Sequence, residues 1–229
     1  SRLATNITNG IIHAFKEYDA SEIIMGLHEK KTDGDKFWGI FTPDLVNQLN
    51  RQIILCRCNR PLNTLRRILV AVPSRVEFEQ GFYRWIERLA RLAENLSCRI
   101  IFHGRIESTS LINEYIRNQH PGVRAEYVLM EHWKEFTQLA QQMSSDHMLV
   151  VISARQGTVS YKPVFERLPL ELYRHYHEHN LMVVFPDQNG QSPEDMTFTA
   201  PQHHSVDSAY SSIVNWVMNK IDKGRSDAS

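Results

Sequence analysis

The sequence has few cysteines, no excess charge of either sign and no long hydrophobic run, and each absence excludes a class of protein. Cysteine accounts for three of 229 residues, and the spacing of Cys56 and Cys58 is wrong for a zinc knuckle, so a reducing compartment is expected. Lys plus Arg and Asp plus Glu both number 26, and this balance argues against a dedicated binder of nucleic acid or of an anionic membrane. No apolar run approaches the roughly 20 residues that span a bilayer, so the chain itself is expected to be soluble.

What the sequence does contain is an alternation of short apolar strands with amphipathic helical patterns. From Arg67 onward five strands are expected, separated by helices that include a long one over 77–96 and one over 108–118 capped by Ser108. The expected strands are 68–72, 99–103, 125–129, 148–153 and 181–185. This alternation predicts an α/β fold with a doubly wound, parallel, five-stranded sheet.

A shorter version of the same pattern precedes this series. A strand over 22–26, a loop, a helix beginning at Pro43 and a strand over 52–56 repeat the order seen at the end of the chain. This first copy lacks its opening strands, which suggests that the chain begins within a domain. The expected organisation is a partial first domain over 1–60, a linker over 61–66, a complete second domain over 67–187, and a polar loop with a C-terminal amphipathic helix over 188–229.

Two stretches of the second copy carry a family resemblance. The opening Ile-Leu-Val-Ala-Val of 68–72 and the closing Met-Val-Val-Phe-Pro of 182–186 resemble the universal stress protein family. The resemblance covers roughly residues 3–187 and implies the adenine nucleotide alpha hydrolase-like fold, as one partial and one complete copy.

A narrower resemblance rests on the first copy. The Ile-Ile-Met-Gly-Leu-His of 23–28, the Phe-Trp-Gly of 37–39 and the linked second copy are similar to the cytosolic C-terminal region of bacterial sodium/proton antiporters. This implies a non-enzymatic regulatory domain at the cytoplasmic face of the bacterial inner membrane, joined to a membrane transport domain of the same polypeptide and forming a homodimer. The alternative is a stand-alone tandem universal stress protein that binds an adenine nucleotide.

The phosphate-binding pattern of the family's nucleotide binders is broken in both copies. Those members pair an Asp after the first strand with a glycine-rich cradle after the fourth, because glycines let backbone N–H groups approach phosphate. Here Pro73 stands at the Asp position, Ser153 replaces the first cradle glycine, and Glu29 replaces the second glycine of the partial copy. These replacements argue against ATP binding in the family's usual mode.

The loop that follows strand 148–153 nevertheless carries groups that suit an anion. Open parallel sheets bind ligands at the carboxyl ends of their strands, and this loop supplies hydroxyls, a flexible glycine and two cations. Two further candidates, Val72 and Ser74, lie at and just after the end of the first strand of the complete copy. The candidate ligand-binding residues are therefore Val72, Ser74, Ser153, Arg155, Gly157, Thr158, Ser160 and Lys162. The expected ligand is a nucleotide or another small anion, and the alternative is an ordinary polar connection.

Neither a catalytic residue nor a metal site is predicted. The sequence has no Gly-x-Ser-x-Gly elbow and no His-Glu-x-x-His, which disfavours a small hydrolase. His175 and His179 would share a helix face, but no third metal ligand is evident, and a solvated helix end is the simpler interpretation. The eleven histidines suggest a pH signal as an alternative to a ligand.

A run of arginines straddles the expected linker. It consists of Arg51, Arg57, Arg60, Arg66 and Arg67, in a region with few acidic residues. The run is predicted to be either a docking face for lipid headgroups or an acidic partner, or a solvated linker.

Overall fold

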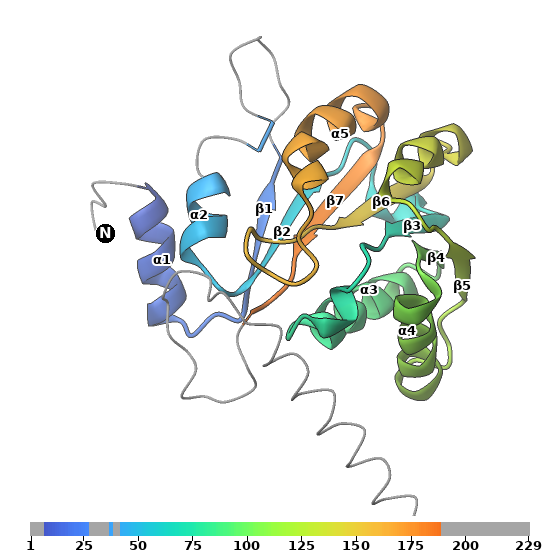
Figure 1. Cartoon of the computed structure of the whole chain (residues 1–229), viewed down its shortest axis with the longest axis horizontal. Helices are drawn as coiled ribbons and strands as arrows, with labels where there is room; N and C mark the ends of the chain where they lie inside the picture. Colours follow the sequence, from blue (N-terminus) through green and yellow to red (C-terminus); the bar gives the residue numbers. More distant parts are fainter. Residues whose placement is uncertain (1–6, 28–36, 39–41, 189–229) are drawn as a thin grey trace, which may run out of the picture.

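The computed structural model describes residues 7–27, 37–38 and 42–188, which form a mostly parallel seven-stranded sheet with helices on both faces (Figure 1). The strand order is β1-β2-β7-β6-β3-β4-β5. The strands are β1 (Glu22–Gly26), β2 (Gln52–Arg57), β3 (Arg67–Ala71), β4 (Arg99–Gly104), β5 (Ala125–Leu129), β6 (His147–Ile152) and β7 (Asn180–Phe185). The α-helices are α1 (Ile7–Glu17), α2 (Thr42–Gln48), α3 (Phe82–Asn95), α4 (Ile106–Gln119) and α5 (Leu168–Tyr176). Four 3-10 helices complete the set: η1 (Leu62–Thr64), η2 (Val76–Phe78), η3 (Trp133–Gln142) and η4 (Pro163–Arg167).

The sheet has two strands more than the five predicted, and it is not wholly parallel. β1 and β2 join the later strands because β2 pairs antiparallel with β7, with Ile53 opposite Phe185 and Arg57 opposite Leu181. Every other strand pair is parallel. Without β2, strand β7 would be a long apolar edge, and such edges invite pairing. The N-terminal strands β1 and β2 therefore belong to the same sheet as the five later strands.

Two apolar cores cover the two faces of the sheet. The helices α1, α2, η3 and α5 lie on one face, and α3 and α4 lie on the other (Figure 1). Leu45 of α2 and Leu172 of α5 are fully buried in the first core, and Trp85 of α3 is fully buried in the second. The central strand β6 is buried along its whole length, as expected for a parallel strand that is covered on both sides.

Two helix boundaries differ from the prediction. The helix expected over 77–96 is split into η2 and α3, and between them the chain at Gly81 lies against the backbone of Asp187, with no room for a Cβ. Ser108 is not an N-cap: α4 begins at Ile106, and the buried Ser108 hydroxyl donates to Glu77 Oε2 at 2.5 Å. The expected C-terminal amphipathic helix lies outside the described residues. Among the described helices, none is both long and apolar enough to cross a membrane.

A hydrogen-bonded carboxylate joins α3 to α4. Glu87 accepts hydrogen bonds from Tyr115 Oη at 3.0 Å and Arg91 Nε at 2.5 Å, and its Oε2 lies 2.6 Å from His120 Nε2. The contact with His120 is the main cause that lowers the pKa of Glu87 to about 2. A carboxylate with a lowered pKa stabilises the fold above its unfolded pKa, and this contribution is lost as the pH falls toward the folded value.

We therefore expect Glu87→Gln to lower the free energy of unfolding by about 1–2 kcal/mol at neutral pH and to flatten its decrease between about pH 4.5 and pH 2. Urea unfolding at several pH values measures both effects. Glu131→Gln, at an exposed carboxylate, is the matched control. An unchanged acid slope in the Glu87 variant would contradict the assigned role.

Candidate functional site

The candidate site lies where the loops after β3, β4 and β6 meet at the carboxyl edge of the sheet. β3 is flanked by β4 on one side and by β6 on the other, so the chain leaves the centre of the sheet in two directions. Such a switch point is the usual ligand position in open α/β sheets. The polar residues at this edge come from Ser74 and Arg75 after β3, Arg105 after β4, and the loop 153–162 after β6.

At this edge, a carboxylate of the same chain accepts hydrogen bonds that a bound anion would otherwise accept. The backbone N–H and the hydroxyl of Ser160 both donate to Glu79 Oε1, at 2.9 and 2.6 Å. Ser160 is buried, and Glu79 follows η2 in the loop after β3. A hydroxyl paired with an N–H is the donor set that a phosphate oxygen would take, and here a side chain of the same chain takes it.

Three cations gather near this pair. Burial lowers the pKa of Lys162, and the positive charges of Arg105 and Arg75 lower it further. These side chains belong to the loops after β6, β4 and β3, and Arg75 and Arg105 are exposed. Like charges brought together favour a bound anion. We call Arg75, Arg105 and Lys162 the cationic cluster.

Arg155 has a different role from the one that its sequence position suggests. It is buried, and its guanidinium donates to three main-chain carbonyls: Val46 O at 3.2 Å, Arg51 O at 2.6 Å, and Pro186 O. Burial lowers its pKa to about 10, while the charges of Asp187 and Glu79 oppose the shift, so it stays protonated at neutral pH. The side chain joins α2, the start of β2 and the end of β7, and it does not point to the open edge.

The other predicted residues divide into buried and loop positions. Val72 is buried and its N–H donates to His103 O, while Ser153 is buried and its N–H donates to Val184 O. Gly157 has a φ of 90°, and the Thr158 hydroxyl donates to Arg155 O, so both shape the loop itself. Ser74 lies half-buried after β3. The structure thus brings Ser160 and Lys162 to the site edge, and ligand binding by the predicted residues stays a prediction.

Sequence reasoning did not select Glu79, Arg75 or Arg105. Arg75 and Arg105 follow the ends of β3 and β4, so their positions after parallel strands were a usable signal. Glu79 carried no such signal, because its sequence pattern predicts a continuous helix. In the structure it lies between η2 and α3, where its side chain reaches Ser160.

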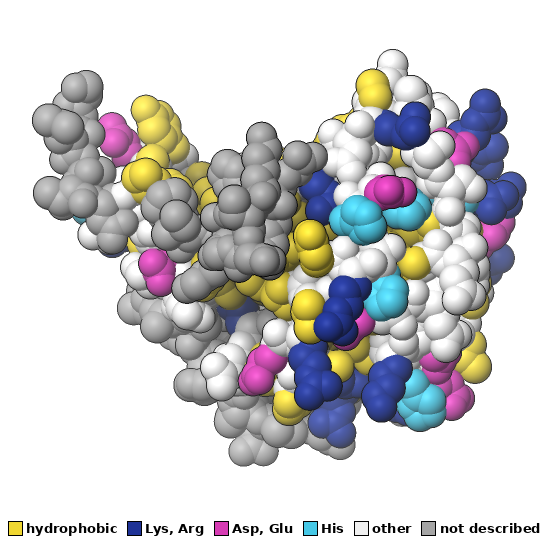
Figure 2. Space-filling model, turned by 90° about the horizontal axis from the view of Figure 1, so that it is seen from above, with side chains coloured by type: hydrophobic (Ala, Val, Ile, Leu, Met, Phe, Trp, Pro, Cys, Tyr) yellow, Lys and Arg dark blue, Asp and Glu magenta, His cyan; other side chains and the backbone are white. Residues whose placement is uncertain are grey.

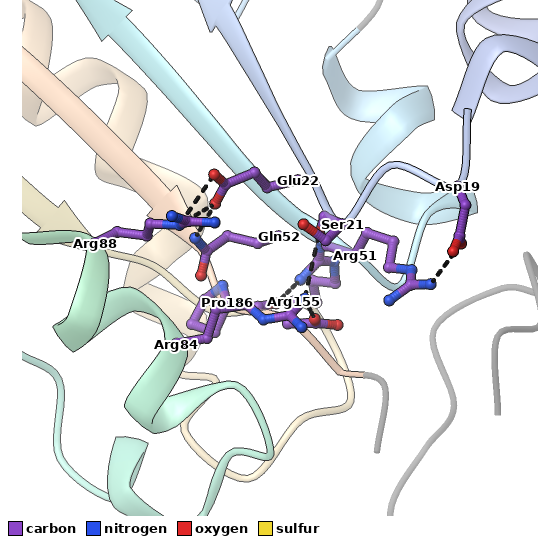
Figure 3. Close-up of polar contacts among 10 residues, drawn as sticks. Asp19, Ser21, Glu22, Arg51, Gln52, Arg84, Arg88, Arg155 and Pro186 are labelled. Carbon is purple, nitrogen blue, oxygen red and sulfur yellow. Dashed lines mark hydrogen bonds and ion pairs between the residues drawn. The ribbon is translucent and has the colours of Figure 1, made fainter. Parts of the chain in front are cut away.

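Next to the site, a network of polar contacts joins the N-terminal region to α3 (Figure 3). Arg88 of α3 contacts Glu22 of β1, at 3.0 Å from Oε1, and Gln52 of β2 donates to the same carboxylate at 3.0 Å. Arg84 pairs with the buried Asp187 and donates to Ser21 O at 3.3 Å. α3, β1 and the end of β7 are therefore held together beside Arg155.

His175 and His179, which were expected to share a helix face, do not lie on one helix. α5 ends at Tyr176, so His175 lies on the helix and His179 lies beyond it. No group of three or more His, Cys, Asp or Glu side chains that could hold a metal is present within residues 7–27, 37–38 and 42–188.

No protein-family model matches the chain, and no curated protein matches it. Among solved structures, a universal stress protein from Archaeoglobus fulgidus DSM 4304 superposes with a TM-score of 0.52 at 14% identity, over 79% of this chain and 66% of that protein. The fold is similar to that of a universal stress protein. A putative universal stress protein from Pseudomonas aeruginosa UCBPP-PA14 matches at a TM-score of 0.47 and 16% identity, over 80% of this chain and 70% of that one.

A functionally unknown protein from Pseudomonas aeruginosa PAO1 matches at a TM-score of 0.45 and 18% identity, over 80% of this chain and 69% of that one. At these identities the likeness is one of fold alone. The position of the candidate site at the carboxyl edge of β3 and β6 follows from the strand order of this chain.

Proposed function

We propose that this chain is a non-enzymatic regulatory domain that senses a small anionic ligand at the cationic cluster. In the absence of the ligand, Glu79 occupies the Ser160 donors. The observation that carries the proposal is the double hydrogen bond from Ser160 to Glu79 Oε1 beside the cations. A ligand that displaces Glu79 would release the loop before α3, and α3 contacts the N-terminal region through Arg84 and Arg88. Ligand exchange would thereby change how the two regions pack.

The proposed organisation is a tandem of stress-protein-like copies, partial over 1–60 and complete over 67–187. The unit β1-α2-β2 has the same order as β6-α5-β7, with parallel strands and its helix on the same face of the sheet (Figure 1). The two units meet at the antiparallel β2–β7 pair, as expected for two related halves packed around a local two-fold axis. This arrangement supports the tandem interpretation.

The parent protein that we propose is a bacterial sodium/proton antiporter, with this chain as its cytosolic C-terminal region and a homodimer as its assembly. The support is the sequence resemblance of the first copy. The alternative, a stand-alone tandem universal stress protein binding an adenine nucleotide, is disfavoured by the broken glycine pattern. Sequencing the native reading frame upstream of Ser1 decides between them. A series of hydrophobic spans upstream supports the antiporter, and a start codon with no such spans before this sequence contradicts it.

The ligand proposal predicts opposite effects for two substitutions. Glu79→Gln removes the competing carboxylate charge, so we expect inorganic phosphate, AMP, ATP or a cyclic dinucleotide to bind about tenfold more tightly than to the wild type. Lys162→Gln removes a cation and is expected to weaken the same ligand about tenfold. Isothermal titration calorimetry with each ligand measures both changes.

Glu107→Gln removes an exposed carboxylate of α4 and serves as the matched control. If Glu79→Gln and this control respond alike, Glu79 does not compete with a ligand. Tight ATP binding by the wild type, unchanged in Glu79→Gln, would favour the stand-alone nucleotide binder.

A further inference from the structure

The amino edge of the sheet, opposite the candidate site, is lined with arginines. Because β2 runs antiparallel to β7, its carboxyl end lies beside the amino ends of β3, β4, β6 and β7. The arginines at this edge are Arg60, Arg66, Arg67, Arg99 and Arg124, all exposed or half-exposed. We call this set the cationic edge. The structure separates Arg51 from the others, since it lies at the opposite end of β2 and is 4% exposed.

The carboxylates near this edge do not balance its charge. Arg99 pairs with Glu126 at 2.8 Å, and Arg66 lies 3.7 Å from Asp146. Within the described part of the chain, no carboxylate forms an ion pair with Arg60 or Arg67. In a chain with no net charge, this edge is therefore a local positive surface.

Three histidines lie at the same edge, of which His177 is exposed, His179 is half-buried and His147 is buried. His147 begins β6 and lies opposite Arg67 in the β3–β6 pairing, while His177 and His179 precede β7. Figure 2, which looks onto the top of the molecule as drawn in Figure 1, shows His side chains beside Lys and Arg side chains, with fewer Asp and Glu among them. Protonation of these histidines would add positive charge to the cationic edge.

We propose that the cationic edge binds the anionic phospholipid surface of a membrane, and that protonation of His147 and His179 strengthens the binding. The inference rests on the proposed function, in which the chain lies next to a membrane. It places the cationic cluster on the edge that faces away from the bilayer, where a ligand can reach it.

The chemistry of the edge favours lipid headgroups over an acidic protein. Protein interfaces depend on aromatic or aliphatic anchors, whereas an anionic bilayer attracts clustered arginines through charge. The exposed large apolar side chains of the described residues include none from segments 57–60, 66–67, 97–99, 124 and 144–147. One exposed aromatic side chain, Tyr173 of α5, lies beside the edge, with its ring centroid 6.2 Å from that of His177.

The direction of the pH effect follows from the groups around the two less exposed histidines. Burial lowers the pKa of His147; Asp146 raises it, and Arg67 and His179 lower it further. Burial also lowers the pKa of His179; Glu178 and a hydrogen bond with the Met143 backbone raise it, and His177 and Arg57 lower it. Lipid phosphates favour the protonated form, so binding takes up protons and tightens as the pH falls.

Vesicle sedimentation tests the proposal with the full chain, using phosphatidylcholine vesicles with or without about 30% phosphatidylglycerol. We expect binding to the anionic vesicles alone, several-fold tighter at about pH 5.5 than at about pH 7.5. Arg60→Gln combined with Arg67→Gln is expected to lower the partition coefficient about 30-fold, at about a fivefold loss for each arginine. Circular dichroism confirms that the variants are folded.

The matched control is Lys134→Gln combined with Arg167→Gln, which removes two exposed charges that belong neither to the cationic edge nor to the cationic cluster. We expect it to bind vesicles like the wild type. An equal loss in the control would overturn the proposal, and so would equal binding to neutral vesicles. Capture of an acidic protein through Arg60 and Arg67 without vesicle binding would overturn it in favour of a protein partner.

The same experiment separates this inference from the proposed function. Vesicle binding by a chain whose upstream reading frame encodes no membrane spans would remove the antiporter and keep the cationic edge. Upstream membrane spans without vesicle binding would keep the regulatory domain and overturn the lipid contact.

Discussion

Replacing Arg155 by methionine is expected to lower the free energy of unfolding by about 4 kcal/mol, the largest effect of any substitution considered for this chain. The guanidinium is buried and donates to the carbonyls of Val46, Arg51 and Pro186. Methionine fills much of the volume but donates no hydrogen bond, so three carbonyl groups lose their donor. The buried Asp187 also loses a nearby positive charge. The loss would fall on the junction of α2, β2 and β7.

Urea unfolding at neutral pH measures this change, and two further variants interpret it. Arg155→Lys keeps the charge but not the planar fork, so we expect it to recover less than half of the loss. Arg167→Gln, at an exposed arginine, is expected to change the free energy by less than about 0.5 kcal/mol. A loss below about 1 kcal/mol in Arg155→Met would show that the junction does not depend on this side chain.

Replacing Gly81 by alanine is expected to cost about 3 kcal/mol, because the added methyl group has no space. A Cβ at Gly81 would lie less than 3.0 Å from the backbone O, N and Cα of Asp187. Backbone atoms cannot rotate away as a flexible side chain can, so α3 or the segment after β7 must move. Such a movement would also strain the Arg84–Asp187 ion pair.

Thermal and urea unfolding measure the effect, and Gly122→Ala provides the matched control. The nearest atom to a Cβ at Gly122 is the side-chain Glu94 Oε1, at an ordinary contact distance of 3.6 Å. We expect this control to lie within about 0.5 kcal/mol of the wild type. If the two glycine variants are equally stable, the close approach of Gly81 to Asp187 does not limit the packing of α3.

The periodicity of the sequence was sufficient to predict most of the elements. The strands expected at 22–26, 125–129 and 181–185 are present within one residue of their predicted bounds, because short runs rich in apolar residues and bounded by polar segments are visible in the local pattern alone. The resemblance to universal stress proteins agrees with the fold. The antiparallel pairing of β2 with β7 was not predictable, because a strand has the same pattern of apolar residues whether its partner runs parallel or antiparallel to it.

The candidate site was predictable in place but not in composition. The carboxyl edge of β3 and β6 follows from the strand order, and Ser160 and Lys162 do lie there. Residue type could not show that Arg155 turns inward to backbone carbonyls while Arg75 and Arg105 remain exposed. Arginine suits both roles, and burial decides between them.

By itself, the sequence determined the order of strands and helices, the absence of a net charge, and the edge at which a ligand would lie. These properties depend on local composition and on the rule that parallel strands end at one side of a sheet. Only the tertiary structure decided that the N-terminal strands extend the sheet, that Glu79 occupies Ser160, and that the exposed arginines gather at the opposite edge. Each of these depends on contacts between residues 20 or more positions apart, whose partners no local pattern specifies.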